Sequence, residues 1–181
     1  MLNPPSAVMP SAPADQWLRC LAVNHLEGHA RFPLFMGLSA SDYQQLMCRV
    51  LLAPADRSAA LNEQDRLLLT LQDRRRQECL DLAQWLSQYR VPDAAPLDRL
   101  IATASMGFNH LWQDLGLASR GELRQLMTDC FPELVLMNQQ NMRWKKFFYR
   151  QLCLIESGEI NCRSPSCDSC CEQASCFSPE D

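Results

Sequence analysis

The chain has 181 residues, 47% of them hydrophobic, which is enough for one domain with a buried core. Its 17 basic and 21 acidic side chains give a net charge of −4, which argues against the general basic field that attracts nucleic acid. No stretch reaches the roughly 18 apolar residues of a membrane-spanning helix. The first residues also lack the basic start and apolar run of a signal peptide. We therefore expect a cytoplasmic protein that binds neither nucleic acid nor membranes.

Helical periodicity dominates the chain after a segment 1–13 that is rich in Pro, Ala and Ser and that we expect to be disordered. No hairpin signal and no convincing period-two alternation is present. The sequence predicts an all-α fold, a compact multi-helix domain over 14–157 with a loop-rich, cysteine-containing C-terminal tail over 158–181. The expected helices begin near Asp15, after a cap at Ser39 or Ser41, within Leu61–Tyr89, at Leu97, after a Ser119 cap, at Pro132, and at Met142 after an Asn141 cap.

The tail holds half of the chain's ten cysteines. Four of them form the motif C-x4-C-x2-C-x5-C, made by Cys162, Cys167, Cys170 and Cys176. In a reducing compartment, thiols clustered in this way bind metal more often than they pair with each other. Thiolates are soft ligands that suit iron–sulfur clusters, zinc and copper(I). The short intervals favour an iron–sulfur cluster over structural zinc, although they match neither ferredoxin spacing.

Other thiols have less defined roles. Cys171 is adjacent to Cys170 and cannot easily reach the same metal corner, so it is a spare ligand, a transfer thiol or incidental. Cys153 lies nine residues before the motif and can assist cluster loading. We expect the remaining cysteines to behave as small buried hydrophobes on apolar helix faces, namely Cys20, Cys48, Cys79 and Cys130.

A basic and aromatic segment precedes the tail. Its cations can dock an acidic partner or attract an oxyanion. The pattern equally fits an amphipathic helix with Trp144, Phe147 and Phe148 in the core and the cations in solvent. The two interpretations are compatible. The cations are Arg143, Lys145, Lys146 and Arg150.

His110 is a second auxiliary candidate. A neutral imidazole there can ligate a metal at an open position, with Asp114, four residues on, as its orienting partner. The simpler interpretation, which we favour, is a hydrogen-bonded histidine at the start of a helix.

Several stretches carry a family resemblance. The segment from Met142 to Cys153 reads Met-Arg-Trp-Lys-Lys-Phe-Phe-Tyr-Arg-Gln-Leu-Cys and is followed by the cysteine motif. Together with three upstream stretches it resembles the NifQ family of nitrogen-fixation proteins, most strongly from Asn109 onward. The cysteine spacing is the signature of that family and matches without a gap. The upstream stretches are Asn109-His-Leu-Trp-Gln-Asp-Leu-Gly-Leu117, Arg120-Gly-Glu-Leu123 and Phe131-Pro-Glu-Leu134.

The resemblance implies a role in molybdenum processing. It implies that a molybdenum–iron–sulfur cluster, derived from an iron–sulfur precursor with molybdate as the molybdenum source, is held by the four motif cysteines. The metal would be donated for assembly of the nitrogenase iron–molybdenum cofactor. The implied acceptors are the cofactor-assembly scaffold complex and the nitrogenase iron protein. The family implies no catalytic turnover, so we expect a metallochaperone and not an enzyme.

Three rival functions remain open from the residues alone. A structural zinc module for protein interaction would bind one zinc and no sulfide. An iron–sulfur electron-transfer protein would keep its cluster metals when mixed with the assembly scaffold. A redox enzyme would need a substrate pocket with converging polar groups, and no motif in the sequence indicates one.

Overall fold

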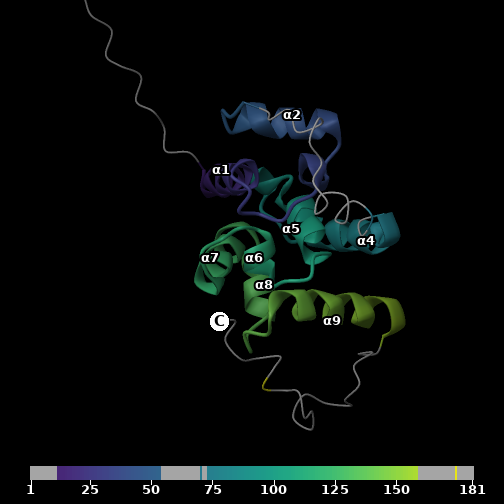
Figure 1. Ribbon diagram of the computed structural model, residues 1–181. Helices are drawn as coiled ribbons and strands as arrows, with labels where there is room; N and C mark the ends of the chain where they lie inside the picture. Colours follow the sequence, from purple (N-terminus) through teal and green to yellow (C-terminus); the bar gives the residue numbers. More distant parts are fainter. Residues whose placement is uncertain (1–11, 54–69, 71–72, 159–173, 175–181) are drawn as a thin grey trace, which may run out of the picture.

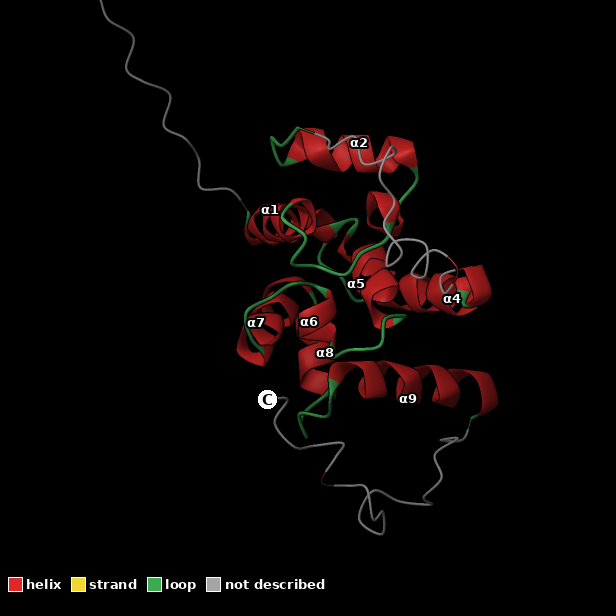
Figure 2. Cartoon of the chain, in the orientation of Figure 1, coloured by secondary structure: helices red, strands yellow, loops and turns green. Residues whose placement is uncertain are grey.

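The computed structural model describes residues 12–53, 70, 73–158 and 174, and this part of the chain is helical without a strand (Figure 1; Figure 2). The all-α prediction is confirmed, whereas the loop-rich character of the tail concerns residues that lie almost entirely outside the described ones. None of the helices in the described ranges has the length and apolar character to cross a bilayer. The α-helices are α1 (Pro13–Leu26), α2 (Ala40–Arg49), α4 (Arg76–Ser87), α5 (Leu97–Ser105), α6 (Leu111–Asp114), α7 (Arg120–Cys130), α8 (Pro132–Met137) and α9 (Trp144–Ser157), with short 3-10 helices at Leu34–Gly37 and Pro92–Ala94.

Helix α5 is the centre of the fold. Every residue of α5 except Arg99 is buried, as expected for a helix surrounded by others. Its buried hydroxyl at Ser105 donates to the Ile101 carbonyl at 2.8 Å, so this polar group is satisfied inside the core. Figure 1 shows α1 and α2 on one side of α5, α4 beside it, and α9 along the opposite side of the molecule.

Helix starts follow the local signals of the sequence. The Ser39 side chain accepts a hydrogen bond from the Asp42 N–H at 3.1 Å, and Ser119 accepts one from the Glu122 N–H at 3.2 Å. The Glu122 carboxylate in turn accepts from the Ala118 N–H at 2.7 Å, one residue earlier than an ideal capping box. Pro132 opens α8, as predicted.

The start of α9 differs from the prediction. The helix begins at Trp144, and Asn141 is not its cap but a residue in the left-handed region, with φ of 55°. The Asn138 amide explains the difference, because it donates to the Met142 carbonyl and accepts from the Met142 N–H, both at 2.8 Å. This pair of hydrogen bonds holds Met142 in a closed loop. The helix therefore begins two residues later than predicted.

Arginine side chains hold the loops in place. Arg120 donates to the Asn141 carbonyl at 2.6 Å, and Arg75 donates to the Met106 carbonyl at 3.1 Å. Arg49 donates to the carbonyls of Ala95 and Asp93 at 2.5 and 2.6 Å. Loop carbonyls that no helix can satisfy are therefore paired with guanidinium groups.

An aromatic cluster attaches α9 to the body. Trp144 and Phe148 on α9 are buried with ring centroids 5.8 Å apart, and Phe147 lies 5.7 Å from Trp144. Trp85 of α4 completes the cluster, with its ring 6.1 Å from Phe148. The predicted burial of the α9 aromatics is confirmed, and packing of this kind fixes the helix from which the tail departs.

We predict that Ser119→Ala lowers the free energy of unfolding by about 1 kcal/mol, because the Glu122 N–H loses its acceptor at the start of α7. Urea denaturation followed by circular dichroism measures the change. Ser87→Ala is the control, because that partly exposed residue donates its hydroxyl to the Gln84 carbonyl and caps no helix start. Equal effects of the two substitutions would contradict the capping role of Ser119.

Candidate metal-binding site

The predicted ligand cysteines Cys162, Cys167, Cys170 and Cys176, together with Cys171, lie outside the described residues, so their roles stay predictions. The structure does describe the helix from which their segment departs. Helix α9 ends at Gly158, which has a φ of 69° and whose N–H bonds the Leu154 carbonyl at 3.1 Å. This left-handed helix end suits glycine, and Cys162 follows four residues later.

The cysteines of the described residues are all free thiols, namely Cys20, Cys48, Cys79, Cys130 and Cys153. Burial raises the pKa of Cys130 to about 12 and also raises the pKa of Cys20 and Cys79. The prediction of burial was wrong for Cys48, which is exposed on α2. Cys153, for which no burial was predicted, is half-buried on α9. Within the described ranges no three His, Cys, Asp or Glu side chains are grouped to hold a metal.

A buried carboxylate, Asp114, is the centre of a polar network at the base of α9. Only 1% of its side chain is exposed. The Lys145 ammonium lies 2.6 Å from Oδ2, and the Asn109 amide donates to Oδ1 at 2.9 Å. Lys145 also donates to the Gly107 carbonyl at 2.9 Å, and the Asp114 carbonyl accepts from the Arg31 N–H at 2.9 Å. The network joins α6, α9 and two loops.

Gly107 is required by this network. A Cβ atom built on Gly107 would lie 2.5 Å from Oδ2 of Asp114, a distance that real Cβ atoms do not show. Sequence reasoning considered Asp114 only as a partner of His110 and missed this pairing. The local signal for a buried Asp114 is its place in an apolar helical segment that follows a glycine. No local pattern connects this carboxylate to Lys145.

The predicted docking cations are thus placed differently from one another. Lys145 is largely buried, with 16% of its side chain exposed, and is bound within the fold. Lys146 is exposed, while Arg143 and Arg150 are partly exposed. Lys145 therefore serves the structure, and a docking role for the other three cations stays a prediction.

His110 is the N-cap residue of α6, so the expectation of a histidine at a helix start is confirmed. Its backbone N–H donates to Oε1 of Gln113 at 3.1 Å. Both carboxylate oxygens of Asp114 are bound by Asn109 and Lys145, as described above.

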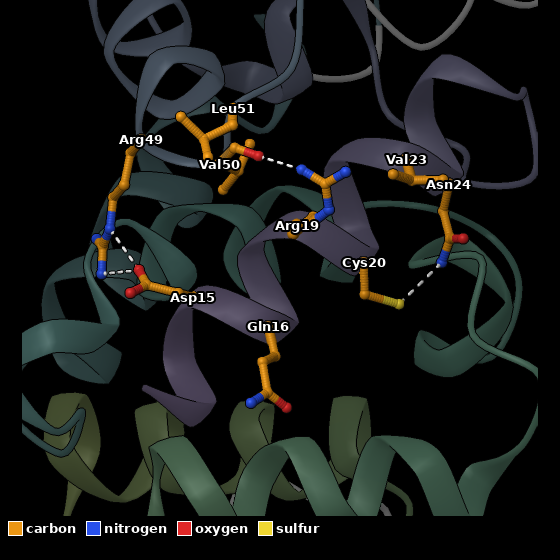
Figure 3. A pocket seen from close by; sticks show the side chains of 9 residues that line it. All are labelled: Asp15, Gln16, Arg19, Cys20, Val23, Asn24, Arg49, Val50 and Leu51. Atoms are coloured by element: carbon orange, nitrogen blue, oxygen red, sulfur yellow. Dashed lines mark hydrogen bonds and ion pairs between the residues drawn. The ribbon is translucent and has the colours of Figure 1, made fainter. Parts of the chain in front are cut away.

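A cleft of about 750 Å³ lies between α1 and the end of α2 (Figure 3). Its charged groups bind within the cleft wall, because Arg49 pairs with Asp15 at 2.7 Å and Arg19 donates to the Val50 carbonyl. The Asn24 amide lies 3.7 Å from the sulfur of Cys20, whose raised pKa keeps it a thiol at neutral pH. One protonated thiol does not make a metal site, so the cleft does not replace the tail motif.

We predict that Lys145→Met costs about 3 kcal/mol of the free energy of unfolding, because it leaves the buried Asp114 carboxylate without its counterion. The adjacent Lys146→Met should change stability by less than about 0.5 kcal/mol, because Lys146 is exposed. Urea denaturation of both variants and the parent measures the difference. A similar small effect at both positions would exclude a stabilising role for the Asp114–Lys145 pair.

Comparison with known proteins identifies the family. The profile of the NifQ family matches residues 17–178. "Protein NifQ" of Klebsiella pneumoniae is 50% identical over 165 residues, which cover 91% of this chain and 99% of that protein. "Protein NifQ" of Azotobacter vinelandii is 36% identical over 172 residues, covering 91% of this chain and 88% of that protein. No solved structure matches. The chain therefore belongs to the NifQ family, which is involved in nitrogen fixation.

Proposed function

We propose that this protein carries a molybdenum–iron–sulfur cluster on Cys162, Cys167, Cys170 and Cys176 and delivers molybdenum for assembly of the nitrogenase iron–molybdenum cofactor. The observation that carries the proposal is the four-cysteine motif within the family match over residues 17–178. The spacing favours an iron–sulfur type of site, and membership of a nitrogen-fixation family favours molybdenum as the additional metal.

The chemistry of the donor set suits a cargo that is given away. A cluster of one molybdenum and three irons takes one thiolate per iron, and a single remaining cysteine fills only part of the larger molybdenum shell. Positions that the protein leaves open are filled by exchangeable ligands, whereas a closed site retains its metal. A carrier needs this incomplete shell, since the acceptor must replace the remaining ligands one by one.

Three of the five described thiols support the same assignment, because they compete poorly for metal. Metal binding requires a thiolate, and burial raises the pKa of Cys20, Cys79 and Cys130 above the ordinary value. At neutral pH these thiols stay protonated inside the helical body. Iron or molybdenum would therefore bind the thiolates of the tail and not the protonated thiols of the core.

The acceptors under this proposal are the cofactor-assembly scaffold complex and the nitrogenase iron protein, and the site of action is the cytoplasm. The protein hands over metal without catalytic turnover. Three exposed or partly exposed cations at the start and along the first half of α9 offer an electrostatic contact for such acceptors, namely Arg143, Lys146 and Arg150.

Metal analysis tests the proposal directly. We expect iron, acid-labile sulfide and molybdenum in protein purified without oxygen from a nitrogen-fixing host supplied with molybdate. Mixing with the assembly scaffold should move molybdenum to the scaffold. Zinc alone would contradict the proposal, and iron and sulfide that stay bound after mixing would instead favour electron transfer.

Substitution of single cysteines tests the ligands. We expect Cys167→Ala or Cys170→Ala to lose most of the bound iron and molybdenum while the far-ultraviolet circular dichroism of the helical body is retained. Cys48→Ala is the matched control, because this thiol is exposed on α2 and is predicted to leave the metal content unchanged. Collapse of helicity in the tail variants would show that body and tail do not fold independently.

A further inference from the structure

Leu51, at the rim of the cleft between α1 and the end of α2, combines two unfavourable properties. Its backbone is in the left-handed region, with φ of 55°, and the residue is 86% exposed. A left-handed backbone is costly for a residue that has a Cβ atom, which is why glycine or asparagine usually follows a helix end of this kind. Exposure of a large apolar side chain adds a second cost. The helix end alone would therefore favour a small or polar residue.

Leu51 differs in this respect from the other left-handed residues. In the described part of the chain, four residues other than glycine have a positive φ. Met36 is fully buried, Phe35 packs against the core, and the Asn141 side chain accepts a hydrogen bond from α7 at 3.1 Å. Leu51 instead has its side chain in solvent. Packing within the described residues therefore does not explain the leucine.

Arg19 of α1 lies next to Leu51. Its guanidinium donates to the carbonyl of Val50, the residue directly before Leu51, and among the described residues this is its one hydrogen bond. A guanidinium has five N–H donors in a planar fork, so most of them remain for another acceptor. Arg19 is exposed, and Figure 3 shows it among the other residues that line the cleft. The cleft thus places hydrogen-bond donors and an apolar side chain close together.

The ionisable groups of the cleft leave one positive charge. Arg49 lies 2.7 Å from Asp15, so this pair is neutral, and Arg49 also donates to two loop carbonyls. Burial raises the pKa of Cys20, so its thiol carries no charge at neutral pH. Arg19 is the remaining charged group among the residues that line the cleft. A site with a single positive charge suits a monoanion.

We propose that this cleft binds a small aliphatic carboxylate, with its carboxylate on the Arg19 fork and its hydrocarbon chain against the apolar side chains of the cleft. Those apolar side chains are Val23, Val50 and Leu51. The volume of about 750 Å³ lies in the range of small-molecule sites. The planar fork matches the two oxygens of a carboxylate. A phosphate group carries up to two negative charges and would leave one of them uncompensated beside Asp15.

The inference goes beyond the proposed function. Figure 1 shows α1 and α2 on the side of the molecule opposite α9, the helix that leads to the cysteine motif. A ligand in the cleft therefore needs no metal in the motif, and its binding is measurable on the metal-free chain.

Arg19 also has a task in the fold. Its positive charge lies at the carboxyl end of α2, where a cation stabilises the helix dipole. Replacement of Arg19 is therefore expected to lower both stability and binding. Leu51 separates the two effects, because glycine at this position relieves the left-handed backbone while it removes the apolar contact. For Leu51→Gly we expect stability and binding to change in opposite directions.

Titration of the full, metal-free chain with sodium octanoate tests the proposal. With reduced thiols at neutral pH, we expect backbone amide NMR signals from α1 and the end of α2 to shift saturably. The expected Kd is on the order of 1 mM, as for a ligand of about ten heavy atoms on an open site. Octanamide, which has the same chain length without the charge, should bind at least about fivefold more weakly. Inorganic phosphate, which has the charge without the chain, should be weaker by a similar factor.

Two substitutions in the cleft and two outside it complete the test. Leu51→Gly should weaken octanoate binding at least about threefold and raise the urea concentration at half-unfolding. Arg19→Gln should weaken binding at least about fivefold. Arg76→Gln and Leu136→Ala remove an exposed cation of α4 and an exposed apolar side chain of α8, and should leave the Kd within about twofold.

The proposal is overturned if octanoate up to about 10 mM gives no saturable shift at the cleft, or if octanamide or phosphate binds as tightly. Unchanged affinity of Leu51→Gly would also overturn it, as would equal losses in the variants outside the cleft. If Arg19→Gln fails to fold, the comparison of octanoate with octanamide on the parent chain decides. Metal analysis tests the proposed function separately.

Discussion

One buried ion pair, between Asp114 and Lys145, sets the position of the helix on which the candidate site depends. The carboxylate is 1% exposed and the ammonium lies 2.6 Å from it, so the attraction acts where water is nearly excluded. Burial of two charges is costly unless each is also hydrogen-bonded. Asn109 and the Gly107 carbonyl supply those bonds, and the pair connects the end of α6 with the first turn of α9.

The consequence is a separation of chemistry between body and tail. In the body, burial raises the pKa values of Cys20, Cys79 and Cys130 on α1, α4 and α7, so these three cysteines stay thiols. The motif cysteines follow α9 within a short distance along the chain. An aromatic cluster and the Asp114 network both anchor α9 to the body, so the segment that carries the motif begins from a fixed point.

Local signals in the sequence predicted the local features well. The caps at Ser39 and Ser119, the start of α8 at Pro132, and the buried side of α9 need only neighbouring residues, and the structure has them as predicted. Features that depend on distant residues were missed. Asp114 and Lys145 are 31 residues apart, and no local pattern distinguishes Lys145 from Lys146. Asn141 failed as a cap because the side chain of Asn138 had already closed the loop.

The candidate ligands illustrate the opposite case. Their number and spacing come from sequence alone, and family membership gives them a context that no local physical pattern could supply. The identity of the metals, the composition of a cluster and the acceptor protein cannot be derived from hydrophobic periodicity or helix signals. Residues 159–173 and 175–181 lie outside the described ones, so the assignment depends on the chemistry of thiolates and on the test by metal analysis.

The guanidinium–carbonyl bonds that hold the loops have a consequence for how the fold responds to acid. Arg49, Arg75 and Arg120 stay charged at any pH at which a protein folds, and a backbone carbonyl does not titrate. The loop shapes set by these bonds are therefore insensitive to protonation. Acidification acts on carboxylates instead. The hydrogen bond from Arg99 of α5 lowers the pKa of Asp42 of α2, so this contact between two helices would be lost as the pH falls through that lowered pKa, while the loops held by guanidinium groups keep their shape.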